Sequence, residues 1–310
     1  MSSSDINPIL HFFIGGVAGA AGAIATSPLE FLKTRLQSTT GQQFFANGCR
    51  HKALNSLPVR FASTNGSVTI VQYFGHIYRV EGGIMAFYKG LRPSLMGIIP
   101  ARAVYFVSYS HYKQFYNRIC RVPNSNKVHL LSAISTGLTM STITSPLWVI
   151  KTKMQLDTRA GKSSPIIHYI QHIWRRDGFR GLYRGLTASY AGSLETGAYF
   201  VVYERLKIYF ANKQHSNLPS YIDYFLAASA AKLTGVLLFY PHEVIRTRLR
   251  QDSFAGHRQY RSFVQTLLKV WSEERLAGLY GGMSLHLLRA VPNTAITFLT
   301  YEAIVSLVNF

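Results

Sequence analysis

The feature that most constrains the fold is a short charged motif that occurs three times along the chain. Each copy starts at a proline, Pro28, Pro146 or Pro241, and places basic residues five and seven positions later. An acidic residue followed by an aromatic-base-glycine or aromatic-Gly-Gly element comes after each copy, as in Glu81 with Tyr88-Lys89-Gly90. A unit that recurs in this way predicts copies of one supersecondary structure packed side by side.

The repeats predict a division of the chain into three parts. We place them at residues 1–120, 121–215 and 216–310. The first spacing between motifs is longer than the second, so the first repeat carries an insertion at about residues 38–67. This stretch is polar and contains Arg50, Lys52 and Arg60. It predicts a solvated loop rather than a contact with lipid or substrate.

Apolar stretches in each repeat predict membrane-spanning helices. Residues 6–29 and 128–150 contain no Asp, Glu, Lys or Arg, and at about 1.5 Å per residue each can cross a hydrocarbon core of roughly 30 Å. Four other stretches contain an ionisable residue far from their ends: Arg102 in 91–118, Glu195 in 186–210, Lys232 in 221–240 and Arg289 in 284–307. A charge at mid-membrane costs about 2.5–3.5 kcal/mol, so these side chains are expected to face a wet interior. Snorkelling toward the helix ends is the alternative.

Shorter amphipathic stretches at residues 68–80, 166–176 and 260–273 predict surface helices. Each repeat then consists of a spanning helix, a surface helix and a second spanning helix. The predicted fold class is an all-α membrane protein with six transmembrane helices in three pseudo-symmetric repeats, each with a short matrix surface helix. Both termini are expected on the same side of the membrane.

Composition excludes several other classes of protein. A net charge of +20 accompanies 48% hydrophobic residues, 19 Tyr and 19 Phe, which excludes a disordered chain. Only 15% of residues are charged, a poor fit to a soluble basic nucleic-acid-binding protein. Cys49 and Cys120 form no disulfide framework, and we expect neither a secretory signal nor an Arg-rich transit peptide.

No group of residues predicts catalysis, a metal site or a bound cofactor. The chain has no glycine-rich phosphate loop. His168 and His172 lie four apart on a predicted surface helix and are expected to face solvent or headgroups rather than a metal.

The triple motif resembles the signature of the mitochondrial carrier family over essentially the whole chain. That signature is Pro-x-acid-x-x-base-x-base, followed downstream by acid-Gly and aromatic-base-Gly. The resemblance implies a monomeric six-helix barrel in the inner mitochondrial membrane that exchanges solutes by alternating access. It also implies cardiolipin sites at Tyr88-Lys89-Gly90 and Tyr183-Arg184-Gly185, while Gly281 departs from the pattern in the third repeat.

The resemblance further implies two gates. Proline removes a backbone hydrogen bond and kinks a helix, so the motif charges are expected to meet on the matrix side. Trp148 replaces one acid and Arg250 replaces a third bracing glutamine, so at most two bridges are predicted. The matrix-gate residues are Glu30, Lys33, Gln37, Lys151, Gln155, Glu243 and Arg246, and the cytoplasmic-gate residues are Lys113, Glu204, Lys207 and Glu302. Ser110 and Val305 depart from the second pattern and leave that gate incomplete as well.

Positions three or four residues back from the gates share a helix face and predict the substrate site. They and an adjacent arginine are Gly97, Arg102, Tyr105, Gly192, Glu195, Tyr199, Lys232, Arg289 and Asn293. Bases outnumber the one acid in this set, which favours an anion. Arginine binds phosphate bidentately and lysine adds a point charge.

Within the family, the stretches 100–106, 122–126, 185–192 with Glu195, 241–248 and 292–296 most resemble the pyrimidine nucleotide carriers. This resemblance implies exchange of pyrimidine nucleoside and deoxynucleoside phosphates, without direct binding of nucleic acid. A folate/FAD or NAD carrier is the alternative, because those carriers share the Pro-x-Trp at Trp148. An uncoupler-like proton conductor is a further alternative, motivated by incomplete gates and by Glu195.

Overall fold

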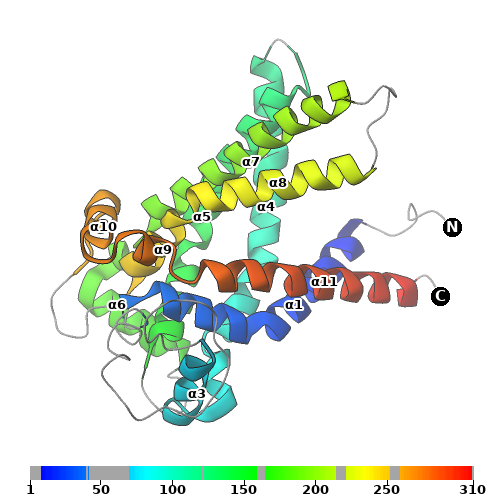
Figure 1. The fold of residues 1–310 in the computed structure, drawn as a ribbon. Coiled ribbons are helices and arrows are strands. Elements are labelled where there is room, and N and C mark those ends of the chain that lie inside the picture. The colour runs from blue at the N-terminus through cyan, green and yellow to red at the C-terminus, as the bar shows by residue number, and fades with distance from the viewer. Residues whose placement is uncertain are drawn as a thin grey trace.

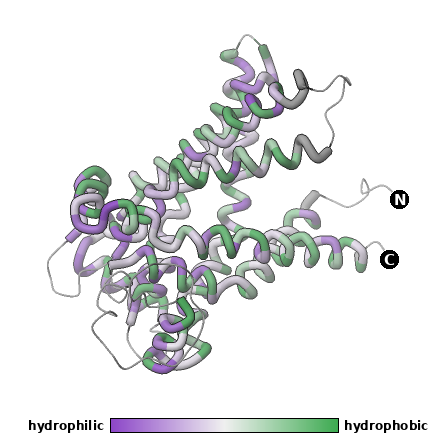
Figure 2. The backbone as a smooth tube through the Cα atoms, viewed as in Figure 1, coloured by the Kyte–Doolittle hydropathy of each residue, from purple (hydrophilic) through white to green (hydrophobic). Residues whose placement is uncertain are grey.

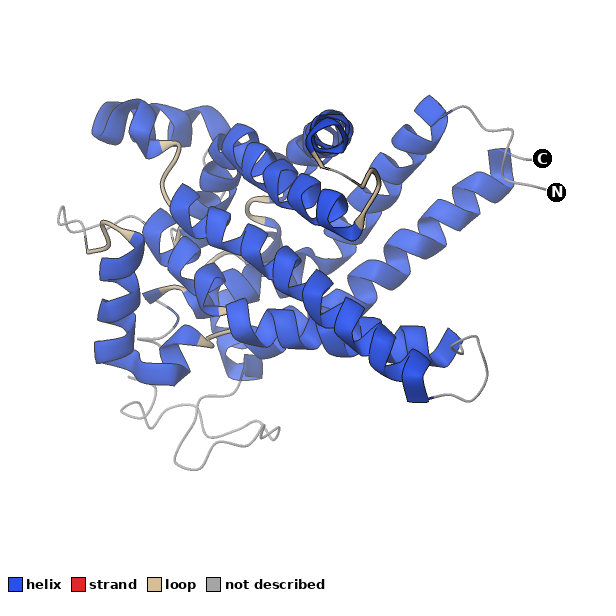
Figure 3. Cartoon of the chain, turned by 90° about the horizontal axis from the view of Figure 1, so that it is seen from above, coloured by secondary structure: helices blue, strands red, loops and turns tan. Residues whose placement is uncertain are grey.

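The computed structural model describes residues 8–39, 41, 70–120, 122–158, 165–213, 221–251 and 259–308, and the regular elements in these ranges are all helical (Figure 3). Of the insertion predicted at 38–67, residues 38, 39 and 41 are described. Arg50, Lys52, Arg60 and Cys49 lie outside the described residues.

Each repeat contains two long helical segments with a short helix between them. The long segments are α1 (Pro8–Gln37), α4 (Leu91–Ile119), α5 (Asn126–Leu156), α7 (Leu186–Lys213), α8 (Tyr221–Phe239) with α9 (Pro241–Arg250), and α11 (Met283–Val308). The short helices are α3 (Ile70–Val80), α6 (Ile166–Gly181) and α10 (Phe263–Leu279), and a 3₁₀ helix, η1 (Gly83–Tyr88), follows α3.

The motif prolines act differently in the three repeats. Pro28 and Pro146 lie inside α1 and α5, where each removes one backbone hydrogen bond. Pro241 begins α9 directly after Tyr240, so the third copy is split into two helices rather than kept as one. Proline suits the first position of a helix because its missing N–H has no partner there.

The long helices form a ring in chain order. Helix α1 packs against α4 and α11, α5 packs against α4 and α7, and α7 packs against α8. The ring closes where Val236, Tyr240 and Val244 pack against Met283 and Leu287 of α11. Figure 1 shows the helices close together near α6, α9 and α10 and diverging at the other end, where both termini lie. Figure 3 also places the two termini side by side.

The apolar core sits where the first long segment of each repeat packs on its own short helix. In the first repeat Phe31, Leu32 and Leu36 contact Tyr73 and Ile77. The equivalent contacts join α5 to α6 through Val149, Ile150, Met154, Tyr169 and Ile173, and α9 to α10 through Ile245, Leu249, Tyr260, Val270 and Leu279. Each surface helix is therefore fixed to the end of the long helix that precedes it.

The long helices carry apolar residues outward. Phe13, Val17, Phe106 and Leu233 are among the exposed large side chains, and Figure 2 shows hydrophobic residues along α8 and α11. By length and apolar composition, one helix of the described part, Leu10–Gln37, qualifies as a membrane span.

Candidate functional site

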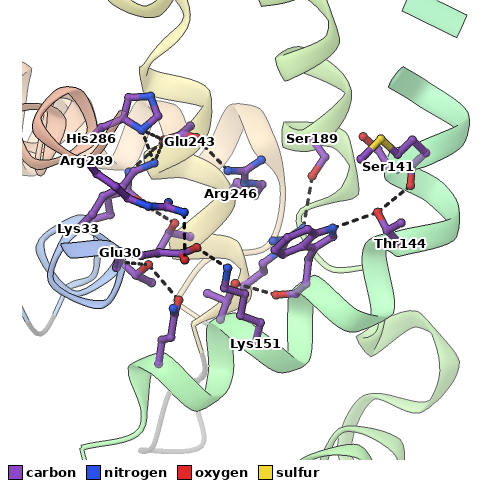
Figure 4. A pocket seen from close by; sticks show the side chains of 18 residues that line it. Glu30, Lys33, Ser141, Thr144, Lys151, Ser189, Glu243, Arg246, His286 and Arg289 are labelled. Atoms are coloured by element: carbon purple, nitrogen blue, oxygen red, sulfur yellow. Dashed lines mark hydrogen bonds and ion pairs between the residues drawn. The ribbon is translucent and has the colours of Figure 1, made fainter. Parts of the chain in front are cut away.

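The ends of α1, α5, α7, α9 and α11 enclose a cavity of about 360 Å³, here called the inner cavity. Its lining is strongly charged and includes Glu30, Lys33, Lys151, Glu243, Arg246, Arg250, His286 and Arg289. Figure 4 shows Lys33, Lys151, Arg246, His286 and Arg289 around Glu30 and Glu243, with Ser141, Thr144 and Ser189 on the opposite side. The cavity lies at the end of the ring where the helices are closest.

Two ion pairs join different repeats across the inner cavity. Lys33 of α1 lies 2.5 Å from the carboxylate of Glu243 on α9, and Lys151 of α5 binds the carboxylate of Glu30 on α1. The Nζ of Lys33 also lies 2.7 Å from Nδ1 of His286. Helix α1 is thus held to the equivalent segments of the other two repeats, α5 and α9.

Glutamines brace these pairs. The amide of Gln37 donates to the hydroxyl of Tyr240 over 3.0 Å and accepts from Thr247 over 2.8 Å. The hydroxyl of Thr34 donates to Oε1 of Gln155 over 3.0 Å. Both predicted glutamines therefore make hydrogen bonds between helices next to the ion pairs.

The third position of the ring has no ion pair between helices among the described residues. Arg246 turns back to Glu243 on its own helix, 3.1 Å away. Trp148 stands where the acid is expected; its ring lies 4.7 Å from Nζ of Lys151, within cation–π range. Its Nε1 donates to Thr144 over 3.1 Å. The contact of α5 with α9 thus lacks the bridge that the other two positions have.

A second cavity of about 490 Å³, here called the outer cavity, lies between α1, α4, α5 and α11. It shares Glu30, Trp148, Lys151 and Arg289 with the inner cavity. Arg289 lies 3.2 Å from the carboxylate of Glu30, so one ion-paired cluster separates the two spaces. Of the predicted substrate residues, the outer cavity brings together Arg102, Arg289 and Asn293.

Glycines of α1 make room for Arg102. A Cβ added at Gly15 would lie 3.1 Å from Nη1 of Arg102, and one at Gly19 would lie 3.2 Å from Nη2. Arg102 comes from α4, so the small residues of α1 let a guanidinium group lie between the two helices. The same glycines that permit close packing thereby position a candidate binding group.

The other predicted substrate residues line neither cavity. Glu195 and Lys232 form an ion pair of 2.7 Å between α7 and α8. Tyr105 stacks on Tyr109, and Tyr199 stacks on Tyr203. A Cβ at Gly192 would lie 2.8 Å from His242, so this glycine serves close approach of that side chain. A Cβ at Gly97 would lie 3.8 Å from Leu147, an ordinary van der Waals distance.

At the opposite end, three of the predicted cytoplasmic-gate residues make no ion pair between helices within the described part of the chain. None of the ion pairs between described residues joins Lys113, Glu204 or Glu302 to a neighbouring helix. Instead, the hydroxyl of Tyr109 bonds His129 over 2.8 Å, and that of Tyr301 bonds His11 over 2.7 Å. The first pair ties α4 to α5, and the second ties α11 to α1.

A set of contacts that sequence reasoning missed lies outside the inner cavity. Arg35 binds Glu81 over 2.7 Å and the carbonyl of Asp157 over 2.8 Å. Arg248 binds Glu274 over 2.7 Å and the carbonyl of Gln37 over 2.6 Å. The second base of the first and third motifs thus ties the acid that belongs to its own surface-helix segment to the end of a long helix from another repeat. The recurrence of this base with a downstream acid was the available signal.

Burial raises the pKa of Tyr73, on α3 beside Arg35 and Glu81, to about 12, against the opposing effect of the Arg35 charge. Its phenol therefore stays protonated at neutral pH.

His286, Ser189 and Arg250 are further lining residues of the inner cavity that the helix-face argument did not select.

The repeat pattern, the ring of helices and the motif charges at its narrow end agree with one family. The family model for mitochondrial carrier proteins matches residues 4–119, 123–214 and 217–310. The chain belongs to the mitochondrial carrier family.

Similar proteins cover nearly the whole chain. Solute carrier family 25 member 36-A of Danio rerio is 38% identical over 319 residues, covering 99% of each chain. Solute carrier family 25 member 33 of Homo sapiens is 40% identical over 314 residues, covering 98% of this chain and 96% of its own. Mitochondrial carrier protein rim2 of Schizosaccharomyces pombe is 36% identical, covering 97% and 90%.

Membership confirms the predicted family and the all-helical fold class. The protein is a transporter of the mitochondrial carrier type and not an enzyme. Members of this family reside in the mitochondrial inner membrane.

Proposed function

We propose that this carrier exchanges pyrimidine nucleoside and deoxynucleoside phosphates across the inner mitochondrial membrane. It acts as a monomer that crosses the membrane six times, with repeats at residues 1–120, 121–215 and 216–310. The family segments 4–119, 123–214 and 217–310 support these boundaries. The motif-level resemblance to pyrimidine nucleotide carriers and the full-length similarity to members 33 and 36 support the substrate class.

The outer cavity is the observation that carries the proposal. Arg102, Lys151 and Arg289 line it, with Glu30 as the one acid of its lining. An excess of cations with low-dielectric walls concentrates anions, and two guanidinium groups suit phosphate oxygens. A volume of about 490 Å³ lies in the range of small-molecule sites.

Polar and aromatic groups of the same cavity suit a base and sugar. Asn293 offers both an amide donor and an acceptor, and its Oδ1 lies 3.3 Å from the hydroxyl of Thr26. Trp148 and Phe298 provide ring faces next to the charged groups. The proposed pose places the phosphates on Arg102 and Arg289 and the base between these rings and Asn293.

The proposed gates follow from the two ends of the ring. The ion pairs of Glu30 with Lys151 and of Glu243 with Lys33, braced by Gln37 and Gln155, close the matrix side. The diverging ends, with Lys113, Glu204, Lys207 and Glu302, form the cytoplasmic gate that closes in the alternate state.

Cardiolipin binding is part of the proposal, through the backbone at the start of α4 and α7. The side chain of Lys89 is buried and bonded to Glu81 and to the carbonyl of Asp157. The first amides of α4 and α7 are therefore the groups proposed to bind the lipid phosphate. We expect no direct contact with nucleic acid.

Counter-exchange in proteoliposomes tests the substrate. The liposomes are loaded with labelled UTP, and UTP, CTP, TTP, ATP, FAD and NAD are each offered separately outside. We expect exchange with the pyrimidine nucleotides and loss of exchange in Arg289→Ala, while Arg180→Ala, on the exposed side of α6, stays active. Preference for FAD or NAD would support the alternative that Trp148 favours, and preference for ATP would refute the pyrimidine assignment.

A further inference from the structure

The third position of the ion-pair ring combines two departures from the repeat pattern. Trp148 stands in place of an acid, and Arg250 stands where the other repeats have Gln37 and Gln155. Arg246 and Arg250 are one helical turn apart on α9, and both line the inner cavity. This position therefore gains a cation and lacks an anion.

Arg250 is buried without a carboxylate. The residue is 6% exposed to solvent. Its Nε donates to the carbonyl of Arg184 and its Nη2 to the hydroxyl of Ser189, both over 3.4 Å. No carboxylate oxygen of the described residues lies within ion-pair distance of it. A buried charge held only by neutral acceptors is costly, so an anion from the cavity would stabilise it.

Arg246 is paired with one carboxylate, that of Glu243, which also binds other basic groups. Its partner Glu243 also binds Lys33 at 2.5 Å and lies 3.8 Å from His286. The Arg246 side chain is 31% exposed, into the inner cavity that it lines. In the whole lining of this cavity, the permanent cations are Lys33, Lys151, Arg246, Arg250 and Arg289, and the carboxylates are Glu30 and Glu243. Both carboxylates are already used by other bases.

We propose that Arg246, Arg250 and the hydroxyl of Ser189 form a phosphate subsite beside the matrix gate. The subsite receives the terminal phosphate of a nucleotide that has moved from the outer to the inner cavity, and it rests on the proposed function in this respect. Figure 4 shows Arg246 and Ser189 facing the same space from α9 and α7. The phosphate supplies the anion that Trp148 omits.

Occupation of the subsite changes the ring of charges. A phosphate that binds Arg246 competes with Glu243 for it, and a phosphate on Ser189 links α9 to α7. The cargo therefore takes part in the charge network that closes the matrix side. In a carrier with three complete bridges this position would be filled by a protein carboxylate instead.

Binding of inorganic tripolyphosphate to the purified full-length carrier tests the subsite without any base. Its dissociation constant is measured from the ligand-induced rise in melting temperature, in parallel with UTP and uridine. We expect Arg250→Gln to weaken tripolyphosphate binding about tenfold, which corresponds to one charge-assisted contact. We expect Trp148→Glu to weaken it similarly, because the new carboxylate would occupy the site, and Arg180→Gln to leave it unchanged.

Glutamine occupies the positions equivalent to Arg250 in the other two repeats, Gln37 and Gln155, so Arg250→Gln is expected to fold. Arg250→Lys, which keeps the charge, should bind tripolyphosphate with intermediate affinity. Unchanged affinity in folded Arg250→Gln, or in Trp148→Glu should the first variant unfold, would overturn the subsite. If Arg250→Gln loses tripolyphosphate binding and the unaltered carrier transports a non-pyrimidine nucleotide, the subsite stands and only the pyrimidine assignment is refuted. Binding of uridine but not of tripolyphosphate by the unaltered carrier would overturn the subsite and leave the base assignment standing.

Discussion

Arg275 lies at the turn near the end of α10 in a backbone conformation that the second repeat gives to glycine. Its φ and ψ are 57° and −148°, and those of Gly178 in α6 are 60° and −154°. This region is nearly restricted to glycine, and a residue with a Cβ is strained there by about 1–3 kcal/mol. The Arg275 side chain is exposed, so its removal takes away little packing.

Replacing Arg275 by glycine is therefore expected to stabilise the carrier. The relief of about 1–3 kcal/mol is reduced by about 0.5–1 kcal/mol, because glycine adds freedom to the unfolded chain. The net gain, taken from the middle of the two ranges, is about 1 kcal/mol. For a chain of this size it corresponds to a rise in melting temperature of about 1–4 °C.

Thermal unfolding of the purified carrier in detergent measures this gain. Arg275→Ala is the matched control: it removes the charge but keeps the Cβ, so no comparable rise is expected. Gly178→Ala should lower the melting temperature, since its added Cβ meets no atom within 4 Å and only the backbone strain acts. Equal melting temperatures for Arg275→Gly and Arg275→Ala would refute the reasoning.

Three further predictions concern contacts between helices. Glu243→Gln removes the carboxylate shared by two bases, which should weaken the closed gate by about 1 kcal/mol. Efflux of labelled nucleotide in the absence of counter-substrate should then rise about fivefold. Unchanged efflux would contradict the gate. Gly22→Ala would place a Cβ 2.5 Å from Oγ1 of Thr297 and should cost about 1–3 kcal/mol, seen as a lower melting temperature than in Gly75→Ala, where the space is open. Tyr301→Phe removes a hydrogen bond to α1 and should cost about 0.5–1.5 kcal/mol; an unchanged melting temperature would show that this contact is not stabilising.

The repeat motif carried most of the predictable information about the fold. One short pattern combined the proline, the charges and their spacing, so it indicated both the number of helices and the convergence of Glu30, Lys33, Lys151 and Glu243 at one end. The structure places these four groups in the two ion pairs described above. The split at Tyr240 was not predictable from the motif, because Pro28 and Pro146 occupy the same position within continuous helices.

The substrate face was harder to predict, because the periodicity of one helix does not reveal its rotation relative to its neighbours. Stepping back along α7 selected Glu195, yet its partner Lys232 lies on the adjacent α8. The same step selected Gly192, whose missing side chain admits His242. Ser189, one turn earlier on α7, lines the inner cavity instead. Only the packed helices show which of these positions face the centre.

The contacts at the narrow end divide into two kinds with different consequences for gating. Apolar clusters mostly join a long helix to its own surface helix, as Phe31 and Leu32 do with Tyr73 and Ile77, and each fully buried side chain contributes about 1.5–3 kcal/mol. The links between repeats are largely polar, such as Lys33 with Glu243, and an ion pair that borders water contributes about 0–1 kcal/mol. Leu285 of α11 and Ala188 of α7 are the members of the apolar clusters that come from another repeat. Opening the matrix side can therefore break the weaker, water-replaceable contacts and leave intact the apolar contacts of each long helix with its own surface helix. The repeats then move as units, and an anionic cargo at the charge-deficient third position is well placed to shift the balance between closed and open states.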